Sequence, residues 1–201
     1  DDPDHEIVRT EVRDPTEAIV DAVRELEAEP PGDVLVFLPG AADIRRVNER
    51  LSAPGALPTT VDVRPLFGAL SQDEQDAALA PSPTGRRRVV LATDIAETSL
   101  TVDGVRIVVD SGQVRTPRYD TRSGLTRLHT GANSRASADQ RSGRAGRTEP
   151  GACYRLWDEA ETRALPAYAD PEILDADLSG LALDLARWGA KDATHLAFLD
   201  P

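Results

Sequence analysis

Apolar runs alternate with amphipathic stretches over the first two thirds of the chain. The run VLVFL at residues 34–38 is apolar at every position, which is typical of a central parallel strand with helices on both faces. Strand-like runs recur at residues 61–66, 88–92 and 105–110, and residues 41–51 can form a helix that returns the chain from the first strand to the second. This alternation predicts an α/β fold with a parallel sheet flanked by helices.

Two sequence signals mark the starts of helices. Asp14 is followed by Pro15, and Glu17 stands three residues after Asp14, which is typical of a helix start. Ser71 and Glu74 are also three residues apart and predict a capping box, in which each residue bonds to the backbone of the other. We expect the first helix to end at the Pro-Pro-Gly of residues 30–32 and the second near residue 80.

Past the strand that ends at residue 110, the pattern changes. Residues 114–119 and 125–130 are β-rich and are joined by five residues that include Gly124, which predicts an inserted β-hairpin. A short helix is expected at residues 137–145 and a further strand at residues 152–156.

The end of the chain has a different character. Residues 178–188 carry an apolar stripe at helical spacing. We therefore expect the α/β domain to occupy residues 1–160 and a separate helical unit to begin within residues 161–201.

The net charge of −12 hides a basic middle. Residues 86–147 hold 12 arginines against six acids, whereas the flanking parts are acidic. A positively charged middle is where a polyanion would dock, although charge that simply fluctuates along the chain remains an alternative.

The composition excludes several classes of site. The only lysine, Lys191, does not lie in a GxxxxGK[ST] sequence, so the chain cannot carry a phosphate-binding P-loop of that type. The single cysteine, Cys153, excludes a disulfide framework, and three scattered histidines predict no metal site. No run of 18 apolar residues and no signal-peptide pattern occur, which favours a cytoplasmic protein with no membrane partner.

The sequence QRSGRAGR at residues 140–147 is the first candidate for chemistry. Its three arginines would share one helical face or fan out from the start of a helix, where each guanidinium offers a rigid fork to phosphate oxygens. Two glycines allow a bulky ligand to approach closely. An exposed basic loop that binds nothing in particular is the alternative, as is an arginine–glycine tract that binds RNA without a fixed fold.

The sequence ATDIAETSLTVDG at residues 92–104 is the second candidate. It directly follows a buried strand, so its hydroxyls and acids should begin at the carboxyl edge of the sheet, where open α/β sheets place their ligands. These groups suit hydrogen bonds to a ribose or a phosphate, but they could equally cap a local helix.

These segments together resemble one family. ATDIAETSLT is similar to motif V of DEAH/RHA helicases, QRSGRAGR to motif VI, VLVFLPGAADI to motif IV, and PLFGALSQDEQ to the stretch between motifs IV and V. Their order and spacing match over roughly residues 1–190. The sequence around these motifs, including EPGACYRLW, is most similar to that of bacterial HrpB-type proteins.

The resemblance implies a second RecA-like domain of an ATP-dependent RNA helicase. In that family ATP and Mg²⁺ bind mainly to a first RecA-like domain, and this chain would complete the cleft. By the family motifs, Arg144 and Arg147 would be arginine fingers, Gln140 would contact the γ-phosphate or the attacking water, and Thr101 and Asp103 would face the nucleotide. The chain alone would hydrolyse no ATP.

The same resemblance implies a path for single-stranded RNA, with DNA also possible. Thr93 and Asp94 would meet the nucleic-acid backbone, and Ser99 would relay between the two sites. The hairpin would separate strands, and the end of the chain would open a winged-helix region. Many relatives have asparagine in place of Asp94, and eukaryotic relatives have an aromatic residue that stacks on a base near the position of Leu79. The contact with the nucleic-acid backbone and the contact with the base therefore both differ here. A non-enzymatic RNA-binding module and a protein-docking domain are the competing hypotheses.

Overall fold

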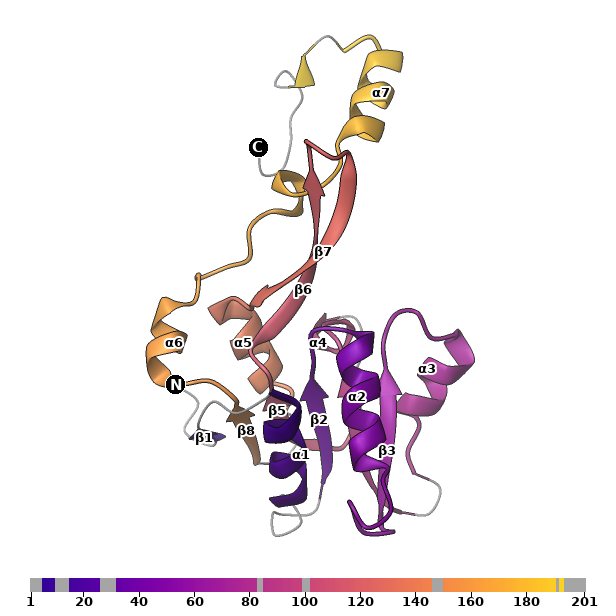
Figure 1. Cartoon of the computed structure of the whole chain (residues 1–201), viewed down its shortest axis with the longest axis vertical. Coiled ribbons are helices and arrows are strands. Elements are labelled where there is room, and N and C mark those ends of the chain that lie inside the picture. The colour runs from indigo at the N-terminus through magenta and orange to yellow at the C-terminus, as the bar shows by residue number, and fades with distance from the viewer. Residues whose placement is uncertain are drawn as a thin grey trace. The chain divides into compact units, whose positions relative to one another are not determined.

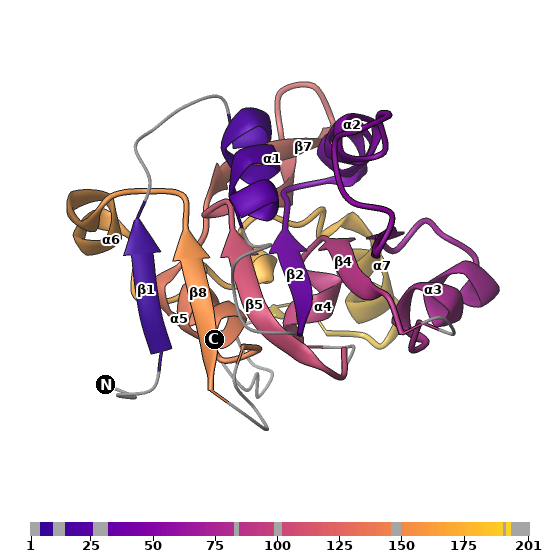
Figure 2. The same cartoon turned by 90° about the horizontal axis from the view of Figure 1, so that it is seen from below.

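Six parallel strands form the central sheet of the computed structural model, which describes residues 5–9, 15–25, 32–82, 85–98, 102–145, 150–190 and 192–193. Their order across the sheet is β1-β8-β5-β2-β4-β3 (Figure 2). The strands are β1 (His5–Arg9), β2 (Asp33–Phe37), β3 (Val61–Leu66), β4 (Arg87–Ala92), β5 (Val105–Asp110) and β8 (Gly151–Arg155). Phe37 is in register with Ala92 and with Asp110, so these strands end at one common carboxyl edge.

Helices cover both faces of this sheet, as Figures 1 and 2 show. The helices α1 (Pro15–Glu25) and α2 (Ala41–Leu51) lie on one face, and α4 (Ile95–Thr98) and α5 (Arg135–Ser142) lie on the other. The helix α3 (Gln72–Leu79) follows β3, and α6 (Glu159–Ala164) follows β8. The parallel α/β fold expected from the alternating pattern is therefore confirmed.

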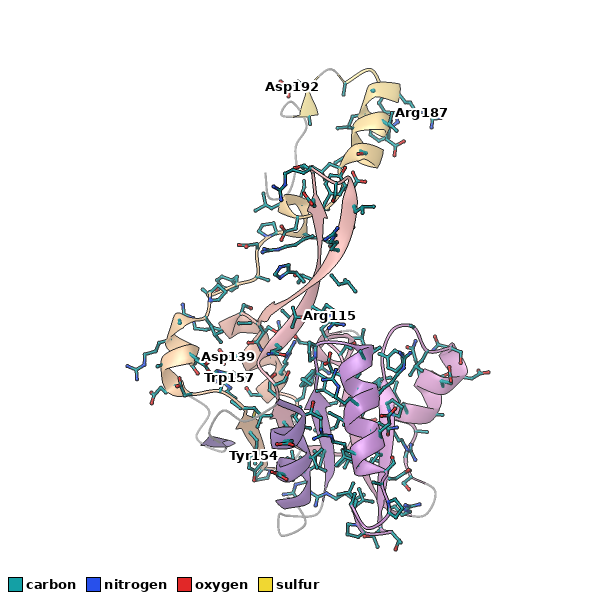
Figure 3. All side chains as sticks on the ribbon, viewed as in Figure 1. Arg115, Asp139, Tyr154, Trp157, Arg187 and Asp192 are labelled. Atoms are coloured by element: carbon teal, nitrogen blue, oxygen red, sulfur yellow. The ribbon has the colours of Figure 1, made fainter. Side chains whose placement is uncertain are left out.

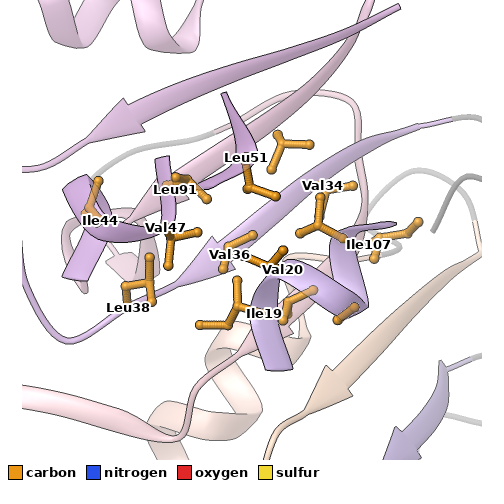
Figure 4. Close-up of a cluster of buried hydrophobic side chains, with 14 of the residues drawn as sticks. Ile19, Val20, Val34, Val36, Leu38, Ile44, Val47, Leu51, Leu91 and Ile107 are labelled. Atoms are coloured by element: carbon orange, nitrogen blue, oxygen red, sulfur yellow. The ribbon is translucent and has the colours of Figure 1, made fainter. Parts of the chain in front are cut away.

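Each face of the sheet has its own apolar core. On the face of α1 and α2, alternate strand residues such as Val34 and Val36 pack with Ile19, Ile44 and Val47 (Figure 4). A second core on the opposite face contains the intervening strand residues and one residue of α4; its buried members include Leu35, Phe37, Val90, Val108, Cys153 and Ala96. Because successive strand residues point to opposite faces, an all-apolar run such as residues 34–38 requires both layers.

Most element boundaries agree with the sequence pattern. The helix at residues 41–51 and the strands at 61–66 and 105–110 have the expected limits, and the capping box of Ser71 and Glu74 is present. Asp14, the expected cap of α1, lies outside the described residues.

Some elements were not expected. The strand β1 and the short helices α4 and α6 are additional, and α6 begins with a capping box of Asp158 and Glu161 that the sequence already contained. The helix α5 spans 135–142 rather than 137–145, because Ser134 caps its start and Gly143 ends it.

The hairpin is present as β6 (Gln113–Asp120) and β7 (Leu125–Ala132), which pair as a separate two-stranded sheet. Arg115, at the base of β6, bonds to the hydroxyl of Thr130 at 3.2 Å and lies 3.6 Å from the Asp43 carboxylate.

The chain divides into two compact units. The first comprises residues 1–115 and 130–169, and the second comprises residues 116–129 and 170–201. Within the second unit, the backbone amide of Tyr119 donates to the carbonyl of Asp175 at 2.8 Å, and a 3₁₀ turn (Glu172–Leu174) precedes α7 (Ser179–Arg187). The domain boundary at residue 160 and the winged-helix region stay predictions.

Candidate functional site

The two candidate segments meet on the face of the sheet that α4 and α5 cover. Glu97, in α4, is the residue that joins them. One oxygen of its carboxylate accepts from the Ser137 hydroxyl at 2.7 Å and from Nε of Arg141 at 2.9 Å. Its backbone carbonyl accepts a hydrogen bond from the guanidinium of Arg144. One residue of the segment at 92–104 thus contacts α5 in its first turn, in its last turn and just beyond its end.

Arg141 is the centre of this network and is almost completely buried. Besides Glu97, it contacts Asp110 at the end of β5, where Nη1 lies 2.9 Å from a carboxylate oxygen. It also donates to the carbonyl of Gln113 at 3.2 Å, and its guanidinium carbon lies 5.0 Å from the centre of the Phe37 ring. These contacts fix Arg141 to the sheet, so its role is to hold structure rather than to meet a ligand.

Burial and charge act in opposite directions on this pair. Burial raises the pKa of the Asp110 carboxyl above its usual value, and the Arg141 charge and the Gly112 amide only partly oppose it. Burial lowers the pKa of Arg141, but Asp110 and Glu97 raise it by more, so the net change is upward. Because Arg141 stays charged throughout, Asp110 always has a cation beside it.

Arg144 and Gln140 lie at the end of α5. Gln140 is exposed in its last turn, and Arg144 follows in the turn that Gly143 begins. Arg144 is 8% exposed, with its guanidinium on the Glu97 carbonyl. Arg147 lies outside the described residues.

The expected placement of the arginines was wrong in one respect. Residues 140–142 of QRSGRAGR form the carboxyl end of α5 and residues 143–145 form the turn after it, rather than one helical face or a helix start. The negative end of the helix dipole favours cations there but gives a phosphate no help. The arginine side chains, not the helix terminus, must therefore supply any anion binding.

The two ends of the hydroxyl-rich segment lie at opposite edges of the sheet. Thr93 is half-buried and Asp94 exposed, directly after β4 at the carboxyl edge. Asp103 is exposed just before β5, at the amino edge. Ser99 and Thr101 lie outside the described residues. The structure therefore separates the residues expected to meet nucleic acid from Asp103, which was expected to meet the nucleotide.

A second buried arginine anchors the loop of Asp103. Arg88 is 4% exposed and bonds to the Asp33 carboxylate, with Nε at 2.7 Å, and to the Asp103 carbonyl at 2.5 Å. It also donates to the carbonyl of Leu79 at the end of α3. This arrangement fixes the amino edge of the sheet much as Arg141 fixes the opposite end.

A third arginine ties α5 to the strand beyond it. Arg155 donates to the Asp139 carboxylate at 2.8 Å, and its guanidinium carbon lies 5.7 Å from the centre of the Trp157 ring. Asp139 and Trp157 lie near each other in Figure 3. The Trp157 ring in turn packs against Gly112, the residue after Asp110 and Ser111.

Sequence reasoning missed the residues that hold the site together. Asp110 ends the otherwise apolar stretch VRIVVD, and a buried acid requires a partner, which was a usable signal. Glu97 is the only glutamate in a segment whose hydroxyls drew attention first. Its partner could not be read from the sequence, because Arg141 is 44 residues away.

Two negative findings apply to the part of the chain that the structure describes. There, no three or more His, Cys, Asp or Glu side chains gather as they would around a metal ion. No helix in that part has the length and apolar character needed to cross a membrane.

Comparisons with known proteins identify the family. Residues 16–149 match the family described as helicase conserved C-terminal domain. The chain is 46% identical over 184 residues to the ATP-dependent RNA helicase HrpB of Escherichia coli, covering 92% of this chain and 22% of that protein. It is 44% identical over 170 residues to the probable ATP-dependent RNA helicase DHX34 of Mus musculus, covering 85% of this chain and 15% of that protein.

Solved structures agree. A crystal structure of the Escherichia coli DEAH/RHA helicase HrpB superposes with a TM-score of 0.89 at 43% identity, covering 98% of this chain and 25% of that one. The chain thus spans between about a seventh and a fifth of the length of these curated relatives. The resemblance inferred from the motifs is confirmed: the chain belongs to the family of helicase conserved C-terminal domains, in its DEAH/RHA branch.

Proposed function

We propose that this chain is the second RecA-like domain of an ATP-dependent RNA helicase, to which it contributes arginine fingers and part of a track for single-stranded RNA. One observation carries the proposal: Glu97 joins the segment of Thr93 and Asp94 to the segment of Gln140 and Arg144. A motor needs such a connection, because hydrolysis at one place must change the grip on nucleic acid at another.

The nucleotide contacts are assigned to five residues. Arg144 and Arg147 would stabilise the charge that develops on the γ-phosphate. Gln140, which is exposed in the last turn of α5, would contact the γ-phosphate or the attacking water. Thr101 and Asp103 would face the nucleotide. Arg144 would leave the Glu97 carbonyl when ATP and the first domain close over it.

The nucleic-acid contacts are assigned to the opposite edge of the sheet. Thr93 and Asp94 follow β4 at the carboxyl edge and would contact the backbone of single-stranded RNA, or of DNA. Ser99, between these residues and Thr101, would relay between the two zones. Asp94 is exposed, so it can accept from a ribose hydroxyl and need not approach a phosphate.

ATP and Mg²⁺ would be bound mainly by another domain. The side-chain donors to Glu97 are two guanidinium groups and one hydroxyl. Guanidinium groups fit phosphate oxygens, whereas Mg²⁺ takes oxygen ligands. The partners of this chain are therefore the first RecA-like domain of the same protein and single-stranded RNA. A cytoplasmic setting stays a prediction.

The test is Arg144→Ala in the full-length protein. The expected result is a loss of RNA-stimulated turnover of about 10³-fold or more, the range seen for arginine fingers. Arg163→Ala is the control, because Arg163 is exposed on α6 and pairs only weakly with Glu159 at 3.8 Å. Stimulated turnover that survives Arg144→Ala would contradict the proposal and favour an RNA-binding module without catalytic arginines.

A further inference from the structure

We infer that Glu97 is a positioning residue that sets the resting place of Arg144 and links it to the segment of Thr93 and Asp94. The inference rests on the proposed function and adds the route by which the nucleic-acid zone would act on the arginine finger. Glu97 itself would touch neither ligand.

Glu97 is attached to α5 and to the turn after it through several hydrogen bonds. Its carboxylate accepts from Ser137 and from Arg141, and its carbonyl accepts from Arg144. The side chain is 13% exposed, so water competes little for these bonds. A shift of Glu97 would therefore act on both ends of α5 at once.

Glu97 also shares a single turn with Thr93 and Asp94, the candidate nucleic-acid contacts. Its amide donates to the carbonyl of Asp94 at 2.8 Å, and the amide of Ala96 donates to the carbonyl of Thr93 at 3.2 Å. A four-residue helix such as α4 is too short to be stable by itself, so tertiary contacts decide where it lies. A strand that pulls on Thr93 or Asp94 would thus move Glu97.

Arg141 has Glu97 on one side and the central sheet on the other. Arg141 is bound on its other side to Asp110, which is completely buried at the end of β5, and it lies over the Phe37 ring. These partners belong to the central sheet and give Arg141 no freedom to follow α4. The part of the network that can change is therefore the contact of Glu97 with Arg141 and Arg144.

The test compares three substitutions of Glu97 in the full-length protein. Glu97→Ala removes the acceptor, Glu97→Asp withdraws it by one methylene group, and Glu97→Gln keeps an acceptor oxygen in place. We expect Ala and Asp to lower the RNA-stimulated kcat by about tenfold, with the KM for ATP and the affinity for single-stranded RNA changed less than about twofold. Gln should retain most of the turnover.

The matched control is Glu74→Ala. Glu74 also bonds to a serine at the start of its helix, but it lies on α3, away from Arg144. Glu74→Ala should lower the free energy of unfolding without changing kcat. In the Arg144→Ala background, Glu97→Asp should cause no further loss, because both changes then act on the same missing group.

The outcomes separate the inference from the proposed function. If Arg144→Ala abolishes stimulated turnover but Glu97→Ala and Glu97→Asp leave kcat unchanged, the inference is wrong and the proposed function stands. An equal loss from Glu97→Asp with and without Arg144 also overturns the inference. Stimulated turnover that survives Arg144→Ala overturns both. Should Glu97→Ala fail to fold, Glu97→Asp decides the question.

Discussion

The guanidinium of Arg141 and the carboxylate of Asp110 form an ion pair at 2.9 Å in which neither side chain is more than 1% exposed. Two charges in such a place are tolerated only because each has further partners. Asp110 also accepts from the amide of Gly112 at 2.9 Å, and Arg141 also contacts Glu97. The pair links the end of β5 to the end of α5, which are 31 residues apart in the sequence.

Arg141→Ala should therefore destabilise the domain strongly. The substitution leaves Asp110 buried without its cation, and breaking a buried pair costs about 3–5 kcal/mol in the free energy of unfolding. Urea unfolding followed by circular dichroism measures the loss. The exposed pair of Arg163 and Glu159 is the control, and Arg163→Ala should change stability by less than about 1 kcal/mol.

A paired replacement sharpens this prediction. Arg141→Met combined with Asp110→Leu removes both charges, so the double variant should be more stable than either single one. Equal losses for Arg141→Ala and Arg163→Ala would show that Asp110 is not stabilised by its partner.

Gly112 should tolerate no side chain. Its φ of +71° is a left-handed conformation, and an added Cβ would lie 2.6 Å from Cε3 of the Trp157 ring. Gly55, with a φ of +77° and no atom within 4 Å of its added Cβ, provides the control for backbone strain alone. Gly55→Ala should cost about 1–2 kcal/mol in the free energy of unfolding.

Gly112→Ala should cost about 1–3 kcal/mol more than Gly55→Ala, because the Trp157 ring must also move. The same urea titration measures both variants. Equal losses would mean that the ring yields without resistance. If Gly112→Ala costs more, as expected, Trp157→Leu should relieve part of that loss, because the smaller side chain leaves room for the added Cβ. This relief would identify the Trp157 ring as the contact responsible.

The sheet could be predicted from the sequence because its signals are local. The all-apolar run at residues 34–38 and the capping box of Ser71 and Glu74 each specify an element by themselves. The strand β1, with the sequence HEIVR, carries no such signal. The end of α5 was placed too late although Gly143, a usual helix terminator, stood within the motif.

The candidate site was only partly predictable. The motifs identified Gln140 and Arg144, but their sequence could not show that Arg141 points into the core while Arg144 rests on the Glu97 carbonyl. Those distinctions depend on distant contacts, such as Arg141 with Asp110, 31 positions apart, and Arg144 with Glu97, 47 positions apart. No periodicity reports such contacts, because it describes only one element at a time.

Protonation of Glu74 should weaken α3. The hydroxyl and the amide of Ser71 hold the pKa of the Glu74 carboxyl below its ordinary value of 4.5. A lowered pKa in the folded state means that the carboxylate stabilises the fold above about pH 4.5, and that this contribution disappears as the pH falls through the lowered value.

The pKa of Glu74 can be measured by following its side-chain carbon in an NMR titration. In Ser71→Ala the hydroxyl is lost, so the pKa of Glu74 should rise towards its ordinary value. An unchanged pKa in Ser71→Ala would show that the hydrogen bond of 2.7 Å from the Ser71 hydroxyl to the carboxylate does not persist in solution.

Cys153 should be inert in the folded protein. It is the only cysteine, it is completely buried in β8, and burial, as the largest cause, raises the pKa of its thiol from 9.0 to about 12. Only the thiolate reacts with disulfide reagents, and this rise in pKa reduces the thiolate population at a given pH by about a thousandfold.

At pH 8, a coloured aromatic disulfide should therefore label Cys153 in the native protein only through opening of the fold, whereas urea should make labelling immediate. Arg141→Ala should accelerate labelling in the absence of urea, because it lowers the free energy of the opening that exposes the thiol; Arg163→Ala should not. Rapid labelling of the unaltered native protein would show that Cys153 is accessible and that the apolar core around it opens readily.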